Sequence, residues 1–385
     1  MGVPPEFCPW PCCPTLPGDG CRVRSAKKVT FMNATRWPRL MLALMLLQAA
    51  LPVFAQQDRS YTIPSFTFEN GRTVTELKVG YATWGKLNDR RDNAVLLLPA
   101  TNGGRLWPAA YVGPGKAFDP EKYFLIGADA LGTGLSSKPS DGMGAEFPRY
   151  TIRDMVRAEY ELIVKGLGIT QLLAVGGPSM GSFQSLEWAV NYPDAMKGIF
   201  GWVPAARVDA RFQLLADAIT AAVTLDANYQ AGRYTAKPLE GLKRGGLVYF
   251  PWLYGDAYIA TLKDPVEYEK AKYSFGNTWA ANWDANDLLW RYNASRGHDV
   301  SAPFKGDLAA ALARVQVPAL LVRSESDRLV SPDLSIETAT LLPRATLAVV
   351  PGIMGHLAYT MPPGRPEHEA FNRLTGAFLA KLATE

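Results

Sequence analysis

Short apolar segments alternate with longer segments of helical periodicity along most of the chain after residue 56. Each short segment is a continuous apolar run bounded by glycine, proline or polar residues, which is typical of strands buried on both faces of a sheet. The alternation predicts an α/β fold, with a mostly parallel central sheet flanked by helices. The predicted strands are Ala94–Leu98, Tyr123–Ala128, Leu172–Gly176, Gly198–Val203, Ala319–Arg323 and Thr346–Val350.

Helix starts can be placed from capping residues. Thr151 and Asp154 have the spacing of a capping box, and apolar residues recur at helical spacing from there to Leu167. Residues Asp307–Arg314 have a second helical pattern, where the sheet pattern resumes after an interruption.

That interruption, from about residue 205 to residue 305, lacks strand signals and is rich in aromatic residues. We predict a helical cap over 205–305, inserted between two parts of the α/β core, 56–204 and 306–385. The cap aromatics would form either an apolar wall for a substrate or simply the core of the cap. The tryptophans in question are Trp252, Trp279, Trp283 and Trp290.

The pattern at the N-terminus is different. After Met32, a basic flank precedes an apolar run that ends at Ala55, and polar residues follow. This order predicts a signal peptide over 32–55, with cleavage after Ala55 and a periplasmic or secreted product. The apolar run has 16 residues, including one Gln and one Pro. A spanning helix needs about 20, so a membrane anchor is the weaker alternative.

Residues 1–31 are rich in proline and hold all four cysteines of the chain. They are interpreted as an over-extended start, with Met32 as the true initiator, or as a disordered extension. Cleavage after Ala55 would remove six basic and two acidic residues, which lowers the formal charge from +4 to zero and leaves 330 residues without cysteine. Such a chain is long enough to be stabilised by its core without disulfides.

Composition excludes several classes of function. The chain of 385 residues is 48% hydrophobic and 20% charged, as in soluble globular proteins, and it has no basic block for a nucleic acid. No metal site is predicted, because the three histidines form no HExxH or His/Cys cluster. His298 and His368 are expected to be solvated. No cofactor is predicted, since neither a G-x-G-x-x-G nor a Walker A motif occurs.

The candidate chemistry begins at residues 177–181, Gly-Pro-Ser-Met-Gly, which fit the G-x-S-x-G pattern. An apolar strand precedes the pattern and a helix follows at once, so the turn between them is expected to be sharp and strained. Such a turn lifts the Ser179 hydroxyl above the sheet edge. The N–H group of Met180 can then donate to an oxyanion.

A serine nucleophile needs a base, and the base needs an orienting carboxylate. Asp327 and His356 each follow the end of a predicted strand, in the chain order Ser, acid, His. Asp333 and Glu325 are competing acids.

The second oxyanion donor is expected in the loop after the first predicted strand. Thr101 is the preferred residue and Asn102 is the alternative.

The stretch around this motif resembles the homoserine O-acetyltransferase family of α/β-hydrolase-fold proteins, and the resemblance runs from about Tyr81 to the C-terminus. It implies a triad of Ser179, Asp327 and His356, with a covalent acyl-serine intermediate, and pairing of two copies through the cap. The segments that carry the resemblance are GYATWGKLN, YVGPGKAFDPEKYFLIGAD, WDAND and FPRYTIRDMVRAEYELIVKGLGITQLLAVGGPSMGSFQSLEWAVNYPD.

Three positions depart from that family's pattern. Leu357 follows the histidine where the family has an aspartate for the substrate's amino group, and Thr220 or Ala221 stands where it has an arginine for the carboxylate. LGTGLSSKPS replaces a G-x-x-G-S-T-G-P-like segment. An amino-acid zwitterion would therefore be buried without charged partners, which costs several kcal/mol.

These observations predict an exported serine hydrolase acting on a small-molecule carboxylic ester, with water as the abundant acyl acceptor. The first alternative is an acetyl-CoA-dependent O-acyltransferase that acts on a hydroxyl acceptor. A second alternative is a catalytically inactive binding protein on the same fold, against which the intact Ser, Asp, His order speaks. No nucleic-acid partner and no membrane span after signal cleavage are expected.

Overall fold

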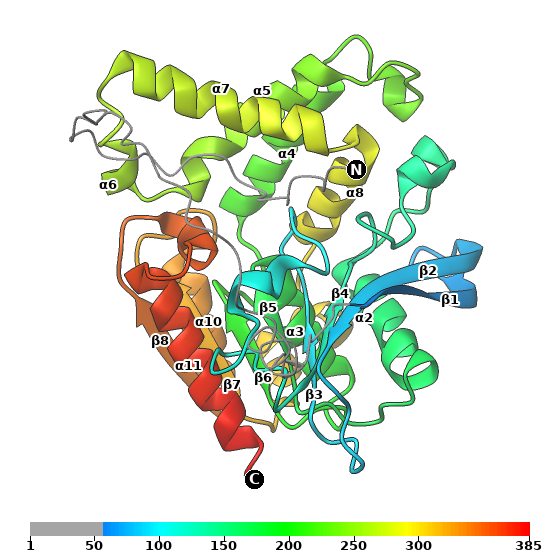
Figure 1. Ribbon diagram of the computed structural model, residues 1–385. Helices are drawn as coiled ribbons and strands as arrows, with labels where there is room; N and C mark the ends of the chain where they lie inside the picture. The colour runs from blue at the N-terminus through cyan, green and yellow to red at the C-terminus, as the bar shows by residue number, and fades with distance from the viewer. Residues whose placement is uncertain (1–56) are drawn as a thin grey trace, which may run out of the picture. The chain divides into compact units, whose positions relative to one another are not determined.

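The computed structural model describes residues 57–385, so the signal peptide and the segment predicted over 1–31 lie outside the described residues. Eight strands form one sheet in the order β1-β2-β4-β3-β5-β6-β7-β8 (Figure 1). From β4 to β8 the neighbouring strands are parallel, whereas β2 is antiparallel to both β1 and β4. The strands are β1 Gln57–Thr67, β2 Thr73–Trp84, β3 Ala94–Leu97, β4 Phe124–Ala128, β5 Ala174–Pro178, β6 Ile199–Trp202, β7 Ala319–Ser324 and β8 Ala345–Val350.

The six strands predicted from apolar runs are confirmed as β3 to β8, with ends shifted by one or two residues. The hairpin of β1 and β2 was not predicted. In β1, buried Ile63 and Phe66 stand among exposed polar residues, so no continuous apolar run marks the strand. The α/β architecture with a mostly parallel sheet is thus confirmed, and an antiparallel hairpin extends it at one edge.

Helices cover both faces of the sheet. Trp202 in β6 donates its indole N–H to Thr375 of α11, whereas the neighbouring Gly201 lies against Ser182 of α3. Adjacent strand residues point to opposite faces, so α11 covers one face and α3, with α2 beside it, covers the other. The helices of the core are α2 Ile152–Glu161, α3 Met180–Asn191, α9 Leu308–Leu312, α10 Pro332–Leu341 and α11 Pro366–Leu382.

The capping box at the start of α2 is confirmed. The Asp154 N–H donates to the Thr151 side chain at 3.1 Å, and the Thr151 N–H donates to the Asp154 carboxylate at 3.1 Å. The helix predicted to reach Leu167 continues after Glu161 as a π-helical turn over Leu162–Gly166.

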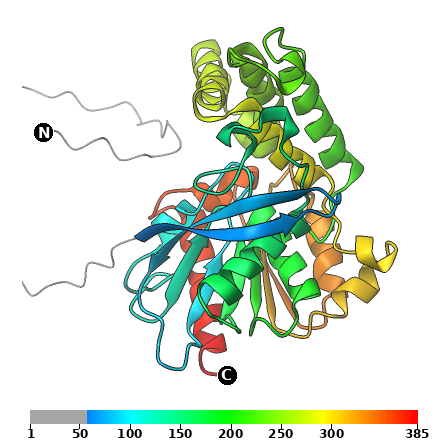
Figure 2. The same ribbon diagram turned by 90° about the vertical axis from the view of Figure 1, so that its right-hand side faces the viewer.

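The segment predicted as a cap is helical and lies over one end of the sheet in both views (Figures 1 and 2). Trp279 and Trp290 are almost fully buried, and Trp279 packs against Tyr249, Phe275 and Tyr292. Trp279 therefore belongs to the interior of the cap, whereas Trp290 donates its indole N–H to the Phe147 carbonyl and packs between the cap and the core. Its helices are α4 Ala210–Thr224, α5 Leu239–Leu253, α6 Asp256–Ile259, α7 Pro265–Asn282 and α8 Ala285–Arg296.

The prediction that His298 and His368 are solvated is wrong. His298 stacks on Phe183 at 4.4 Å between ring centroids, bonds to the Ala205 carbonyl, and burial lowers its pKa to about 4. His368 stacks on Tyr111 at 4.1 Å. Neutral imidazole rings pack as flat aromatic groups, a role that their polar sequence neighbours do not indicate.

No helix within residues 57–385 has the length and apolarity needed to cross a membrane.

Candidate active site

The turn between β5 and α3 has the strained geometry predicted for the G-x-S-x-G segment. Ser179 adopts φ 53° and ψ −118°, in a region that side-chain-bearing residues rarely occupy. A Cβ atom on Gly177 or on Gly181 would overlap the carbonyl oxygen of Leu98. Both positions therefore require glycine, because the loop after β3 passes directly against the turn.

The three side chains predicted as a triad lie in one hydrogen-bonded chain. The Ser179 Oγ lies 2.9 Å from the His356 Nε2, and the His356 Nδ1 lies 2.8 Å from the Asp327 Oδ2. Their exposed fractions are 4% for Ser179, 1% for His356 and 6% for Asp327. An ionised carboxylate only accepts hydrogen bonds, so the Nδ1 donates and the Nε2 can accept the serine proton.

The loops after β7 and β8 place the acid and the base. The Asp327 Oδ1 accepts from the N–H groups of Leu329 and Val330 at 2.8 and 3.1 Å, which leaves the Oδ2 for the histidine. The hydroxyl of Ser326 donates to the Gly352 carbonyl at 2.6 Å and accepts from the Gly355 N–H at 3.1 Å. The two loops are thus joined beside the triad.

The cap also contacts these loops. A Cβ on Gly355, which has φ 60°, would lie 2.6 Å from the Gly255 nitrogen, and the Gly255 N–H donates to the Ile353 carbonyl. Arg328 forms an ion pair with Asp256 at the start of α6. The position of the histidine therefore depends on contact with the cap.

The competing acids are excluded by their positions. Glu325 and Asp333 are exposed on either side of Asp327, whereas Asp327 is buried and bonded to the imidazole.

The predicted oxyanion loop follows β3 and is held against the turn. Gln184 of α3 donates to the Pro99 carbonyl at 3.3 Å and to the Met180 carbonyl at 3.2 Å. Among residues 57–385, no acceptor is bonded to the backbone N–H of Thr101, Asn102 or Met180. These N–H groups are therefore available as donors, and Thr101 and Asn102 both stay candidates for the second one.

Three residues of α8 that contact this loop were not singled out from the sequence. Arg291 donates to the carbonyls of Ala100 and Gly103, Tyr292 accepts from the Asn102 amide, and the Ser295 hydroxyl faces that of Thr101. Burial lowers the pKa of Arg291 to about 10, so the guanidinium stays charged at neutral pH. The sequence feature that could have identified Arg291 is a single charged residue within the otherwise apolar and aromatic run LLWRY.

The two positions where the acetyltransferase pattern has a charged residue carry no charge in this chain. Leu357, next to the base, is almost fully buried. Thr220 is half-buried and donates its hydroxyl to the Ala216 carbonyl within α4, and Ala221 is exposed. None of these side chains can pair with an amino group or a carboxylate of an amino acid.

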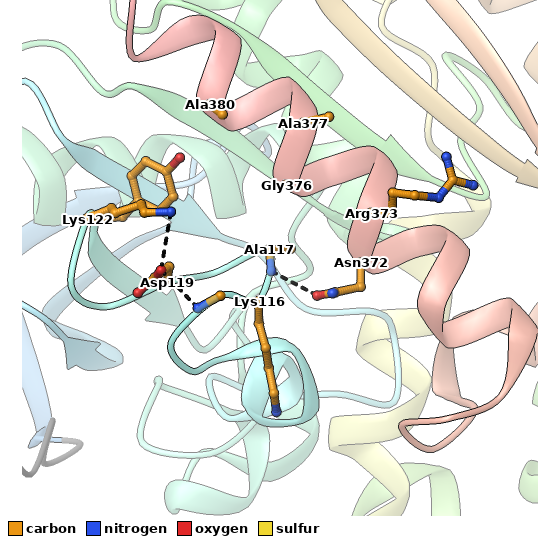
Figure 3. Close-up of a pocket in the computed structure, with 11 residues that line it drawn as sticks. Lys116, Ala117, Asp119, Lys122, Asn372, Arg373, Gly376, Ala377 and Ala380 are labelled. Carbon is orange, nitrogen blue, oxygen red and sulfur yellow. Dashed lines mark hydrogen bonds and ion pairs between the residues drawn. The ribbon is translucent and has the colours of Figure 1, made fainter.

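A pocket of about 230 Å³ lies elsewhere, between the loop around Lys116 and α11 (Figure 3). No residue of the triad lines it. The ammonium of Lys116 donates to the Ala110 carbonyl, and Lys122 pairs with Asp119 at 3.5 Å. Among residues 57–385, no group of three or more His, Cys, Asp or Glu is placed to hold a metal ion.

Comparison with known proteins agrees with this architecture. Residues 93–359 match the family model of the alpha/beta hydrolase fold. A homoserine O-acetyltransferase of Nostoc punctiforme is 33% identical over 322 residues, which cover 77% of this chain and 90% of the relative.

Two solved esterase structures are similar in fold. An acetylester hydrolase from Corynebacterium glutamicum superposes with a TM-score of 0.78 at 25% identity, covering 84% of this chain and 96% of that one. The acetyl esterase MekB gives a TM-score of 0.77 at 27% identity, with 86% and 97% covered. Both acetyltransferases and esterases are thus among the relatives, and the chain belongs to the homoserine O-acetyltransferase-like family of the α/β hydrolase fold.

Proposed function

We propose that the protein hydrolyses carboxylic esters through an acyl-serine intermediate. The observation that carries the proposal is the buried chain of hydrogen bonds from Ser179 through His356 to Asp327, at 2.9 and 2.8 Å. The Nε2 of His356 removes the Ser179 proton as the Oγ bonds to the acyl carbon. The carbonyl oxygen becomes an oxyanion, to which the N–H groups of Met180 and Thr101 donate.

Collapse of this intermediate breaks the bond to the alcohol, which leaves with the proton held on the Nε2. Water then attacks the acyl-serine and gives its proton to the same nitrogen. A second collapse releases the carboxylic acid and returns the proton to the Ser179 Oγ. Throughout, Asp327 stabilises the imidazolium and does not itself take the proton.

Hydrolysis is favoured over acyl transfer to an amino acid by the uncharged residues at the two positions where the acetyltransferase pattern has charged ones. Leu357 is buried directly after the base, and Thr220 donates within its own helix. A zwitterionic acceptor would lose its hydration without gaining charged partners, which costs several kcal/mol. A neutral ester meets no such penalty.

The second candidate is transfer of an acyl group to a hydroxyl acceptor. It is favoured by the curated relatives, which carry the name homoserine O-acetyltransferase at about one-third identity. The two candidates share the acyl-serine and differ only in the molecule that attacks it.

An acceptor experiment separates the candidates. We expect p-nitrophenyl acetate to be cleaved at a rate that does not change when a simple alcohol or homoserine is added, with one acetate formed per nitrophenol. An acetylated acceptor, formed as the rate of nitrophenol release rises, would establish the transferase instead. A parallel assay with acetyl-CoA and homoserine tests the relatives' named reaction directly.

We further propose that the protein is exported and cleaved after Ala55, from the basic flank and apolar run of residues 32–55. Expressed in a bacterium with the full N-terminus, the product should be periplasmic and begin at Gln56 by N-terminal sequencing. Ala55→Leu should leave the longer precursor, because signal peptidase requires a small residue there. A full-length chain in the cytoplasmic fraction would refute export.

A further inference from the structure

Arg291 binds both ends of the loop segment that carries the proposed oxyanion donor. Its Nη2 lies 2.9 Å from the Ala100 carbonyl oxygen, and both Nη atoms lie 3.2 Å from the Gly103 carbonyl oxygen. These two carbonyls bracket Thr101 and Asn102. The guanidinium of a cap helix thus clamps a two-residue segment of the core.

Burying the charged guanidinium of Arg291 removes it from water, which costs free energy. The Arg291 side chain is fully buried and its Nε has no hydrogen-bond partner. Among residues 57–385 no carboxylate lies within ion-pair distance of it, although its guanidinium lies 5.3 Å over the Trp283 ring and the charges of Asp129 and Asp287 act on it from farther away. Desolvating a charge without a counter-ion is costly, and the carbonyl acceptors offset only part of that cost. Well-packed apolar residues often replace buried charged groups without loss of stability, so packing alone does not explain the arginine.

The bond to Ala100 bears directly on the donor. The Ala100 carbonyl and the Thr101 N–H belong to one trans peptide group, in which C=O and N–H point in opposite directions. The Ala100 carbonyl also accepts from the Gly103 N–H at 2.9 Å, so the turn and Arg291 together fix the direction of the Thr101 N–H. A hydrogen bond to the oxygen of an amide also polarises its N–H group and makes it a stronger donor.

The neighbouring residues of α8 support the same loop. The Ser295 Oγ lies 3.4 Å from the Thr101 Oγ1, and the Asn102 amide donates to the Tyr292 hydroxyl at 3.4 Å. These are longer contacts than those of the guanidinium. Arg291 is therefore the principal link between the cap and the loop.

We propose that Arg291 is a positioning residue for the oxyanion hole, which aims and polarises the Thr101 N–H by binding the Ala100 and Gly103 carbonyls. The inference rests on the proposed acyl-serine chemistry. It makes the cap part of the catalytic apparatus through a residue that never touches the substrate.

The test compares Arg291→Met, which keeps an unbranched stem and removes the guanidinium with its donors, with Arg149→Met as a control for the same substitution at a neighbouring arginine. Arg149 is an exposed arginine whose guanidinium lies 3.3 Å over the ring of Trp290, the neighbour of Arg291 in α8, without a bond to the loop. For p-nitrophenyl acetate we expect Arg291→Met to lower kcat about 10- to 100-fold with little change in KM. Arg149→Met should stay within about twofold of wild type.

A thionoester substrate separates positioning from general loss of structure. Thiocarbonyl sulfur is a poor hydrogen-bond acceptor, so p-nitrophenyl thionoacetate depends less on the oxyanion hole. Arg291→Met should therefore lower the ratio of oxoester to thionoester turnover. Arg291→Lys, which keeps the charge and has its donors on a single nitrogen, should restore part of that ratio. This variant carries the test if Arg291→Met does not fold.

If the folded Arg291 variants have the same ratio of oxoester to thionoester turnover as wild type, this inference is wrong. The proposed function would stand. A wild-type protein that cleaves no ester would overturn the proposed function, and with it the role given to Arg291. Unchanged kcat in Arg291→Met would likewise reject positioning by this residue.

Discussion

Ser179→Ala is expected to abolish ester hydrolysis, with kcat lower by about four to six orders of magnitude. Alanine at this position removes the only atom that can form the acyl intermediate in the proposed mechanism, while its Cβ occupies the same place as the serine Cβ. The strained backbone at φ 53° is set by the close approach of the Leu98 carbonyl to Gly177 and Gly181, which the substitution leaves in place. The variant should therefore fold normally.

The measurement is kcat/KM on p-nitrophenyl acetate together with labelling by a fluorophosphonate, read by mass spectrometry of the intact protein. Wild type should gain one adduct at Ser179, and the alanine variant none. Ser185→Ala is the matched control, because Ser185 is also buried in α3 and donates its hydroxyl to the Ser182 carbonyl within that helix. Its activity should stay near that of wild type. Equal turnover by wild type and Ser179→Ala would favour the alternative of a catalytically inactive binding protein on the same fold.

Asp327→Asn is expected to lower kcat about 10⁴-fold without loss of the fold. An asparagine oxygen can still accept from the N–H groups of Leu329 and Val330, so the loop keeps its anchors. Its amide then faces the His356 Nδ1 with a donor in place of an acceptor. The imidazole must shift its proton to the Nε2, which can no longer accept the proton of Ser179.

Asp333→Asn and Glu325→Gln serve as controls for the same change of charge at exposed acids nearby. Both should retain activity within about twofold, because neither carboxylate contacts the triad. Thermal unfolding of each variant checks that the folds are comparable. A loss at Asp333 as large as that at Asp327 would mean that the acid of the triad is assigned to the wrong residue.

Much of the fold could be predicted because buried parallel strands leave a strong local signal. The runs that form β3 to β7 are apolar at nearly every position, since both of their faces are covered. The edge strand β8 is apolar as well, although most of its residues are partly exposed. The hairpin of β1 and β2 carries no such signal, because in β1 the buried residues are widely spaced among exposed polar ones. The burial of His298 was missed for a related reason, since stacking on Phe183 depends on a residue more than a hundred positions away.

The candidate site, like the fold, could be predicted only in part from the sequence. Chain order and local context sufficed to select Ser179 and His356 and to favour Asp327 as the acid. A serine between two glycines, and polar residues just past the ends of strands, are local patterns in the sequence. The choice of Asp327 over Asp333 followed from burial and from a bond of 2.8 Å to the histidine, which no spacing encodes.

The sequence by itself determined the α/β class, the G-x-S-x-G turn at residues 177–181 and the three residues that chain order brings to one edge of the sheet, because periodicity and turn chemistry act over a few residues. Only the tertiary structure decided how the oxyanion loop is held. Arg291 and Ala100 are 191 positions apart, and their bond of 2.9 Å exists because the cap folds back over the sheet. Contacts of that kind depend on how separate elements pack, and one stretch of sequence cannot specify them alone.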